Sequence, residues 1–298
     1  EISDFFKKEW SGEIVERLKA EGELNPDLAP ELHKKMAAQG WLAMGWPKEY
    51  GGKGWSAMEM AIFSEEASYV HVPMKAFGVT SIAGNSIVHM GNEEQKKKYL
   101  PGLAAGDLLY CIGYTEPDAG SDLAALECRA VEDGDEFVVN GVKIFNTAGH
   151  LAHHCWLAAR TDRDAPKHKG ISVFMVDMKS PGVTVRPLHH VGDHHLNEVV
   201  FEDVRVPRQN MVGEKNRGWY VIAKALDIER SGTGFVGECR RALEGLIQYC
   251  RETTRNGVPL SKDPLVRQQL AQLAIETEAA RLISYEVAYL QAKGQIPD

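Results

Sequence analysis

The stretch Tyr114-Thr-Glu-Pro-Asp-Ala-Gly-Ser-Asp122 is the most informative part of this 298-residue chain. Its proline, glycine and aspartates are typical of a turn. The hydroxyls of Thr115 and Ser121, together with the backbone at Gly120, can donate hydrogen bonds to a ring or to a phosphate. Taken alone, the stretch is equally well explained as a capped turn that binds no ligand.

The residues that follow this stretch have the pattern of β-strands. Between Phe137 and Phe145, two apolar runs surround Asn140-Gly141, a dipeptide typical of a two-residue hairpin turn. Four more short apolar runs are separated by turn residues, so the middle of the chain is expected to be a small all-β domain. These runs predict strands at residues 171–176, 183–186, 198–201 and 204–206.

Helical periodicity dominates before the β region. Apolar residues at three- and four-residue spacing predict helices at residues 30–40 and 57–69. A charged helix with a short apolar face is expected at residues 92–100, and Pro101-Gly102 should end it. The N-terminal part is therefore expected to be a helical domain.

The C-terminal part returns to a helical pattern. One long helix is expected over residues 219–254, a break at 255–259, and a second helix from residue 263 past residue 290. Two helices give the apolar stripe of the second too little to pack against, so we expect a bundle that the chain begins and does not complete. The expected domains are 1–108 (helical), 109–211 (β) and 212–298 (helical, truncated).

Composition and charge narrow the class of protein. Lys and Arg number 34 and Asp and Glu 42, so the net charge is −8, which argues against a generic nucleic-acid binder. No apolar run approaches the roughly 20 residues of a membrane helix, and the N-terminus lacks a signal-peptide pattern. The five cysteines are scattered, without metal-ligand spacing, which indicates a reducing compartment and predicts a cytoplasmic protein.

Four stretches carry a family resemblance: TEPDAGSD at 115–122, KIFNT at 143–147, FEDVRVP at 201–207 and LDIER at 226–230. In their order and spacing, they make the chain resemble the acyl-CoA dehydrogenase family. The resemblance covers essentially the whole chain, and TEPxAGSD is highly specific. It implies an α+β multidomain fold with an N-terminal helical domain, a middle β-barrel-like domain and a C-terminal four-helix bundle, incomplete here. It also implies FAD between the β domain and the bundle.

The resemblance assigns cofactor contacts to the first of these stretches. Thr115 and its neighbour Tyr114 are expected along the isoalloxazine ring. Gly120 and Ser121 are expected where the family holds the pyrophosphate and the near end of the substrate. Ser121 therefore counts as both a cofactor-binding and a substrate-binding residue.

The second stretch is expected to contact the same cofactor. The resemblance implies that Thr147 donates a hydrogen bond near flavin N5 and that Asn146 also belongs to the cofactor site. Phe145 stands where many members carry Trp, so it keeps an apolar face but lacks the indole N–H. An ordinary strand face is the alternative for Phe145 and Thr147.

The implied reaction is α,β-dehydrogenation of an acyl-CoA thioester, in which a carboxylate removes the α-proton and flavin N5 accepts the β-hydride. The family places this carboxylate in a late loop of the bundle, expected beyond this chain, or on the first long helix. Glu229 is therefore the expected base, with Asp227 and Arg230 as substrate contacts. The alternative is a solvated Glu229 paired with Arg230 or Lys224.

A departure from the family bears on assembly. Homotetrameric members carry an Arg-x-x-Phe-Gly motif, and its Arg reaches the FAD of a neighbouring subunit. Here Gly257 fits the glycine, but Thr253 and Asn256 stand at the Arg and Phe positions. The sequence therefore favours an α2β2-like heteromer with a paralogous subunit over a homomer. Electron-transfer flavoprotein or an equivalent acceptor is the other expected partner, and a bulky or steroid side-chain thioester in β-oxidation is the expected substrate.

Other interpretations stay open. An acyl-CoA oxidase or a reductase-direction enzyme would use the same scaffold, and a noncatalytic or half-site subunit would tolerate the changes at positions 145, 253 and 256. The paired histidines at 153–154, 189–190 and 194–195 are not expected to bind metal, because adjacent strand residues face opposite sides. The lysines at 96–98 are expected to be a solvated helix face, with a CoA phosphate contact as the alternative.

Overall fold

The fold was analysed in a computed structural model that describes residues 2–21, 29–191, 195–228 and 233–295. The chain forms two compact units, and each unit is assembled from segments far apart in the sequence. Within the described residues, no helix is both long enough and apolar enough to cross a bilayer. The smaller unit contains residues 1–21, 55–72 and 229–298, and the larger unit contains residues 22–54 and 73–228.

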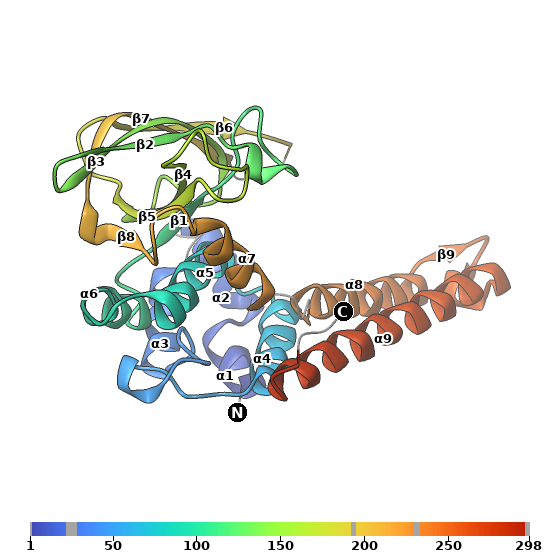
Figure 1. The fold of residues 1–298 in the computed structure, drawn as a ribbon. Helices are drawn as coiled ribbons and strands as arrows, with labels where there is room; N and C mark the ends of the chain where they lie inside the picture. The colour runs from blue at the N-terminus through green and yellow to red at the C-terminus, as the bar shows by residue number, and fades with distance from the viewer. Residues whose placement is uncertain (1, 22–28, 192–194, 229–232, 296–298) are drawn as a thin grey trace. The chain divides into compact units, whose positions relative to one another are not determined.

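The larger unit is built around an eight-stranded mixed sheet (Figure 1). The strands follow the order β6-β7-β3-β2-β4-β5-β8, and β1 pairs in parallel with β4. The long neighbours β3 and β7, β6 and β7, and β4 and β5 are antiparallel. The bounds are β1 (Tyr110–Gly113), β2 (Arg129–Asp133), β3 (Glu136–Asn146), β4 (His154–Arg160), β5 (Ile171–Asp177), β6 (Val183–His189), β7 (His195–Pro207) and β8 (Met211–Val212).

Two hydrophobic cores lie on opposite faces of this sheet. Leu157 of β4 faces one core and its neighbour Trp156 faces the other, as the two-residue period of a strand requires. All six residues from Ile171 to Val176 in β5 are buried, because this strand is covered on both faces.

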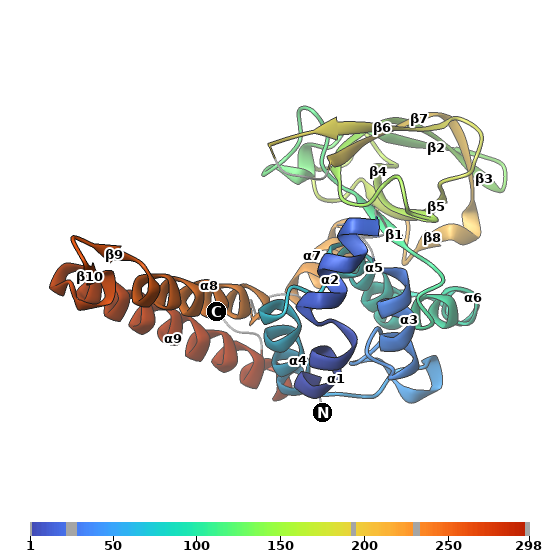
Figure 2. The same ribbon diagram turned by 180° about the vertical axis from the view of Figure 1, so that it is seen from behind.

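Helices cover one of the two faces. They contribute Ala83, Ile87, Leu100 and Ile222 to the core that contains Trp156. Helix α5 packs against β1, and α7 packs against β5 (Figure 2). The helices of this unit are α3 (Pro30–Ala38), α5 (Lys75–Met90), α6 (Glu93–Ala104) and α7 (Gly218–Ile228), with single 3-10 turns at η1 (Lys48–Tyr50), η2 (Leu123–Ala125) and η3 (Arg208–Asn210).

The predicted hairpin at Asn140-Gly141 is wrong, because β3 runs straight through it. The β3–β7 register shifts here, and both ends of the Asn140 side-chain amide bond to Asp203 on the neighbouring strand. A Cβ on Gly141 would lie 2.7 Å from Cα of Cys128, so glycine is required for close strand packing. The dipeptide therefore marks a bulge, and the hairpin turn before β3 lies at residues 134–135.

Two other boundaries differ from expectation. The strands expected at 198–201 and 204–206 are one strand, β7, which bends at Asp203 with φ +52°. Pro101 does not end α6 but lies inside it. The helix continues because an Asn92–Gln95 capping box fixes its first turn and Leu103 is buried in the core beyond the proline. The helix predicted at 57–69 and the strand predicted from 171 are confirmed.

In the described part of the smaller unit, the regular elements are helices and one short hairpin. Helix α8 packs on both α4 and α9, and α8 and α9 are joined by the β9–β10 hairpin. The helix expected over 219–254 spans residues 229–232, which lie outside the described residues; the structure has α7 before them and α8 after them. The bounds are α1 (Ile2–Glu9), α2 (Gly12–Glu21), α4 (Ala57–Tyr69), α8 (Thr233–Glu252), β9 (Thr254–Arg255), β10 (Val258–Pro259), η4 (Leu260–Lys262) and α9 (Pro264–Ala292).

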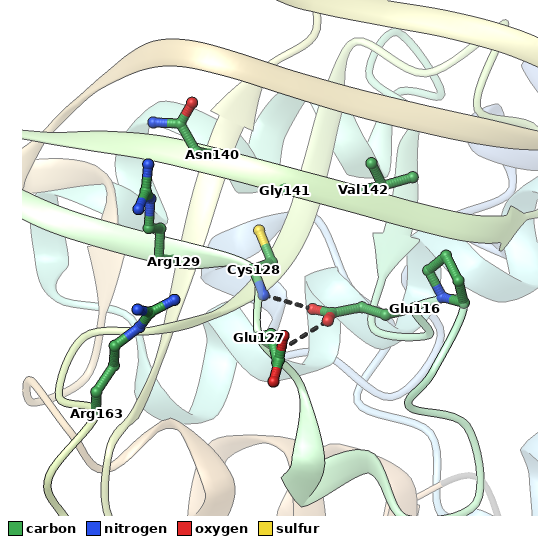
Figure 3. Close-up of a pocket in the computed structure, with 9 residues that line it drawn as sticks. Glu116, Glu127, Cys128, Arg129, Asn140, Gly141, Val142 and Arg163 are labelled. Carbon is green, nitrogen blue, oxygen red and sulfur yellow. Dashed lines mark hydrogen bonds between the residues drawn. The ribbon is translucent and has the colours of Figure 1, made fainter.

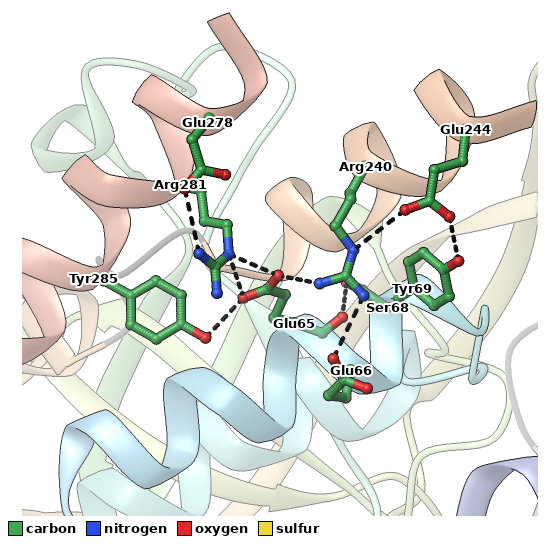
Figure 4. Close-up of polar contacts among 9 residues, drawn as sticks. All are labelled: Glu65, Glu66, Ser68, Tyr69, Arg240, Glu244, Glu278, Arg281 and Tyr285. Atoms are coloured by element: carbon green, nitrogen blue, oxygen red, sulfur yellow. Dashed lines mark hydrogen bonds and ion pairs between the residues drawn. The ribbon is translucent and has the colours of Figure 1, made fainter. Parts of the chain in front are cut away.

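A buried carboxylate connects the three main helices of this unit (Figure 4). Glu65 of α4 is 2% exposed and accepts from Arg240 of α8 at 2.5 Å and from Arg281 of α9 at 3.0 Å. Tyr285 of α9 donates to the same carboxylate at 2.7 Å. At Gly237 a Cβ would lie 2.3 Å from the Glu65 carbonyl oxygen, so the helices touch backbone to backbone there.

Candidate functional site

A buried ion pair joins the TEPDAGSD stretch to strand β3. Lys143 Nζ donates to Glu116 Oε1 at 2.7 Å and to the carbonyl of Tyr114 at 3.0 Å. Glu116 also accepts from the backbone N–H groups of Glu127 and Cys128, at 2.7 and 2.9 Å. A buried charge is tolerated when it is paired and hydrogen-bonded. Glu116 and Lys143 therefore fix the start of the stretch against the sheet.

The end of β3 is irregular and turns Phe145 outward. The β3–β7 register shifts between Lys143 and Asn146, and Phe145 has φ +61° with 58% of its surface exposed. A non-glycine residue with positive φ is uncommon, and bulges occur often beside active sites. Ile144 N donates to Thr115 O at 2.9 Å, so this bulge is bonded directly to the TEPDAGSD stretch.

Two buried asparagines hold the bulge in place. Asn146 Nδ2 donates to Ile112 O at 2.6 Å, and Asn197 Nδ2 donates to Asn146 O at 2.9 Å. Within the described residues, the side-chain oxygens of both asparagines have no hydrogen-bond partner. Because buried polar atoms are rarely left unpaired, these two oxygens mark the bulge as a place with a role beyond packing.

The side chain of Tyr114 points into the core. The ring is 8% exposed, and its hydroxyl accepts a hydrogen bond from Trp156 Nε1 at 3.1 Å. Burial raises the pKa of Tyr114 well above its usual range. Tyr114 therefore positions the stretch through its ring and its carbonyl, and its hydroxyl is not presented at the surface.

Gly120 and Ser121 lie on an exposed part of the stretch whose far end is held by an arginine. Arg160 Nη2 donates to the carbonyls of Ala124 and Leu126, at 2.6 and 3.1 Å. Both Gly120 and Ser121 are exposed, and a Cβ on Gly120 would meet no atom within 4 Å. The loop thus presents open backbone at Gly120 between two fixed ends.

The structure brings the two predicted cofactor stretches together. Thr115 lies on the segment that is bonded to the bulge carrying Phe145, and Asn146 and Thr147 continue that bulge. Within the part of the chain that the structure describes, the hydroxyls of Thr115, Ser121 and Thr147 have no hydrogen-bond partner.

The helix that precedes the expected base is anchored to β5. Thr161 Oγ1 donates to Asn216 Oδ1 at 2.5 Å, and Asn216 N donates to Ser172 Oγ at 2.8 Å. At Gly218, the first residue of α7, a Cβ would lie 2.7 Å from Cα of Ser172. The start of α7 is therefore fixed to the sheet by a close approach that only glycine permits.

The expected base and substrate contacts are not all described. Asp227 lies one residue before the end of α7, and its side chain is not described. Glu229 and Arg230 lie outside the described residues. Their predicted roles therefore stay predictions.

Two of the paired histidines, His189 and His195, lie with His150 close to the bulge. His195 has its ring centre 4.5 Å from that of His150 and 5.7 Å from that of His189, whereas His194 lies outside the described residues. His150 also lies 3.3 Å from Asn197 Nδ2. Within the described ranges, no group of three or more His, Cys, Asp or Glu side chains is arranged to hold a metal ion.

Two other basic side chains of these sets, His154 and Lys96, contact side chains of the larger unit. His154 packs against the rings of Tyr99 and Tyr110, at 5.3 and 5.1 Å, and burial lowers its pKa. Lys96 donates to Glu93 at 3.0 Å on the first turns of α6.

Comparison with known proteins identifies the fold. Three family models match in order: the acyl-CoA dehydrogenase N-terminal domain at residues 1–107, the middle domain at 111–204 and the C-terminal domain at 216–298. The chain belongs to the acyl-CoA dehydrogenase family. Acyl-CoA dehydrogenase FadE29 of Mycobacterium tuberculosis is 40% identical over 257 residues, which are 86% of this chain and 66% of that protein.

Two solved structures of this family have the same fold. One, "Tcur3481-Tcur3483 steroid ACAD", matches with a TM-score of 0.89 at 37% identity, over 99% of this chain and 76% of that chain. The other is the ChsE4-ChsE5 complex from Mycobacterium tuberculosis, with a TM-score of 0.85 at 36% identity, over 98% and 74%. The predicted class of a helical N-terminal part, a β middle part and C-terminal helices is confirmed.

The acyl-CoA dehydrogenase family implies FAD, and the described residues suit a flavin. An isoalloxazine ring needs an apolar surface for its face and polar groups for its edge. The exposed ring of Phe145 supplies the first. The unpartnered hydroxyls of Thr115 and Thr147, together with Asn146 Oδ1, supply both donors and acceptors.

The buried residues that hold the acyl-CoA dehydrogenase stretches in place were not predicted from the sequence. Lys143 carries a signal that could have been used, because it shares the inward-facing parity of Phe137 and Val139 in β3. A charged residue at such a position needs a buried partner, and Glu116 is the acid of the neighbouring motif. For Asn197 the sequence offered only the resemblance of the run at 192–197 to a family loop near the flavin, since its partner is a backbone carbonyl 51 residues away.

Proposed function

We propose that the chain is the larger part of an FAD-dependent acyl-CoA dehydrogenase that introduces an α,β-double bond into an acyl-CoA thioester. One observation carries this proposal: the TEPDAGSD stretch and the β3 bulge are bonded together beside the exposed Phe145 ring. They present the hydroxyls of Thr115 and Thr147, which have no partner among the described residues. The chain spans 66% of the length of FadE29, so the activity of the whole protein is part of this proposal.

The flavin end of the site would be formed by residues of the TEPDAGSD stretch and the β3 bulge. Thr115, Phe145, Asn146 and Thr147 would hold the flavin ring, and Thr147 would donate toward its N5 edge. Asn197 would keep this segment in its bulged conformation through the Asn146 carbonyl. The bound flavin would supply the acceptor for the β-hydride of the substrate.

The substrate end of the site would be formed by other residues. Gly120 and Ser121 would contact the cofactor pyrophosphate and the near end of the thioester through exposed backbone and hydroxyl groups. Glu229 would take the α-proton onto its carboxylate, with Arg230 and Asp227 shaping the pocket around it. A desolvated carboxylate is the appropriate base, because the α-proton of a thioester is only weakly acidic.

The substrate class and the partners are proposed from the relatives. A solved structure at 37% identity is titled a steroid ACAD, which supports a bulky or steroid side-chain thioester. Another at 36% identity is a complex of two named proteins, which supports a heteromer of the α2β2 kind. We also propose electron-transfer flavoprotein or an equivalent acceptor as the oxidant, and β-oxidation as the setting.

A cytoplasmic location is proposed from the cysteines. All five are free thiols, and four of them are buried. Scattered buried thiols without disulfides are typical of a reducing compartment.

A half-site subunit is the second candidate, and one observation favours it. Asn256 and Gly257 both have positive φ, at +55° and +76°, and form the two-residue turn between β9 and β10. Asn and Gly are the residues that such a turn prefers. Position 256 therefore serves the turn, and Thr253 offers no guanidinium to a neighbouring subunit's cofactor.

The visible absorption spectrum tests the proposal. The purified protein is expected to bind FAD and to lose its flavin band when acyl-CoA thioesters are added without oxygen; a panel of thioesters then defines the substrate. A protein that binds FAD but never bleaches would support the half-site subunit. Failure to bind FAD both alone and with its paralogous partner would contradict both candidates.

The Glu229→Gln variant tests the base. It is expected to keep flavin and ligand binding and to lose turnover by orders of magnitude, because the amide cannot accept the α-proton. Glu214→Gln is a suitable control, since Glu214 is an exposed carboxylate shortly before α7, the helix that precedes Glu229 in the sequence. Full turnover in the Glu229 variant would remove it from the mechanism.

A further inference from the structure

A second concave site lies in the larger unit, between the start of β2, the middle of β3 and the loop after β4 (Figure 3). Its volume is about 320 Å³, which falls at the lower end of the roughly 300–1,000 Å³ typical of small-molecule sites. None of the residues predicted to bind the flavin or the thioester lines it. The pocket is therefore distinct from the proposed flavin and thioester contacts, although Glu116 and Pro117 of its lining belong to the TEPDAGSD stretch.

The floor of this pocket is fixed by the bulge in β3. Asn140 Nδ2 donates to Asp203 Oδ1, and Asp203 N donates to Asn140 Oδ1, both at 3.0 Å. Gly141 follows with φ +153° and lies directly against Cys128. The thiol of Cys128 is buried, and burial raises its pKa to about 11, so it is uncharged at neutral pH. The floor is thus rigid and neutral.

The carboxylate of Glu116 does not make the pocket acidic. Its charge is balanced by the fully buried Lys143 at 2.7 Å and by two backbone N–H groups. In Figure 3 the Glu116 side chain reaches the backbone of Cys128 and Glu127, and the side chain of Glu127 is turned down, away from that of Cys128.

Two guanidinium groups form the opposite side of the pocket. Figure 3 shows the Arg129 and Arg163 side chains on the side facing away from Glu116, with Cys128 between. Both arginines are exposed, and within the described residues neither has a carboxylate within ion-pair distance. Other exposed arginines of the same sheet are paired: Arg205 bonds Glu136 and Asp133, each at 2.9 Å. The positive charges of the two pocket arginines are thus not paired with a carboxylate.

We propose that this pocket binds a phosphate group, held by the guanidinium groups of Arg129 and Arg163. Guanidinium groups present donors in a planar fork that matches the oxygens of a phosphate, and such charge-assisted hydrogen bonds are among the strongest in proteins. The exposed carboxylate of Glu127 leaves a net local charge of +1 with the two arginines, which suits one anionic group. The volume leaves room for a small organic moiety beside the phosphate, so free phosphate and a nucleotide monoester are the two possible sources.

Isothermal titration of the full chain tests the proposal with inorganic phosphate and with adenosine 5′-monophosphate as the probes. The wild-type chain is expected to bind phosphate, and the Arg129→Gln, Arg163→Gln double variant to bind it about tenfold more weakly or worse, because two charge-assisted hydrogen-bond donors are lost. Tighter binding of the nucleotide than of phosphate would identify a monoester as the ligand. Equal binding would identify free phosphate.

Arg205→Gln is the matched control, because it removes an exposed arginine from the same sheet outside the pocket. It is expected to bind phosphate as the wild type does. The proposal is overturned if the wild-type chain binds neither probe, if the double variant binds as tightly as the wild type, or if Arg205→Gln weakens binding to the same extent. Retention of the flavin spectrum in all variants would separate this result from any failure of the dehydrogenase site.

Discussion

Each of the two units contains a buried glutamate that links several of its segments, but the partners of the two glutamates differ in exposure. Glu116 in the larger unit is paired with Lys143, which is completely buried. Glu65 in the smaller unit is paired with Arg240 and Arg281, whose side chains are 31% and 34% exposed (Figure 4). A fully buried ion has no access to water when its partner is removed, whereas a partly exposed one can be hydrated. The same kind of contact should therefore contribute unequally to stability.

The two networks also differ in what they connect. Glu116 bonds residues 11 to 27 positions away, within a strand and the loop beside it. Glu65 bonds residues 175 to 220 positions away and joins three helices. The first network fixes a local conformation beside the candidate cofactor site, and the second fixes the register of long helices.

The largest effect is expected for Lys143→Met. This change leaves the Glu116 carboxylate buried beside an apolar side chain, and it should lower the free energy of unfolding by about 3–5 kcal/mol in urea denaturation. Lys167→Met removes an exposed pair with Asp122 on the same stretch and should have no measurable effect.

If Lys143→Met does not fold, the double variant with Glu116→Gln provides the test. Removing both charges should recover part of the lost stability, because no uncompensated ion stays buried. A single variant as stable as the wild type would show that Glu116 does not need its partner.

A smaller loss is expected for Glu65→Gln. Arg240 and Arg281 lose their shared counter-charge but keep contact with water, so the free energy of unfolding should fall by about 1.5–3 kcal/mol in the same measurement. Glu278→Gln is the matched control, since Glu278 is 58% exposed and contacts only the outer edge of Arg281. A loss equal to that of Lys143→Met would mean that partner exposure does not govern these energies.

Acid should weaken the Glu65 network. Burial acts to raise the pKa of Glu65, but hydrogen bonds from Tyr285 and Arg281 and the charges of both arginines outweigh it, so the pKa lies below the usual 4.5. The stabilisation is therefore complete above pH 4.5 and is lost as the pH falls through the lowered pKa. Urea midpoints measured across this range should fall more steeply for the wild type than for Glu65→Gln, and parallel curves would contradict this assignment.

The smallest effect is expected for Tyr285→Phe. Burial and the neighbouring Glu65 raise the pKa of Tyr285 to about 12, so its hydroxyl is protonated at neutral pH and donates to the carboxylate at 2.7 Å. Losing one of the several donors to Glu65 should cost about 1 kcal/mol. The partly buried Tyr69, which bonds the exposed Glu244, offers Tyr69→Phe as a comparison with less expected loss.

The sequence indicated which stretches form the candidate site, but it indicated less well which buried residues hold them in place. TEPDAGSD and the KIFNT stretch were expected to meet, and the structure bonds them through Ile144 and Thr115. The sequence did not predict the Glu116–Lys143 pair or the role of Asn197, because these contacts depend on which strands become neighbours. Asn140-Gly141 was misinterpreted for the same reason, since a bulge and a hairpin turn use the same residue types.

By itself the sequence determined the family and the type of most elements, but not the bulge at Asn140-Gly141 or the continuation of α6 past Pro101. Helical and strand periods and the four motif stretches depend on residues close together in the sequence, so they can be recognised before the fold is known. Only the tertiary structure decided which charges are buried together, why Gly141 and Gly218 must be glycine, and that Arg129 and Arg163 share a pocket. These features arise from residues brought together across the sheet, and the free energy of a buried contact depends on neighbours that the linear order does not reveal.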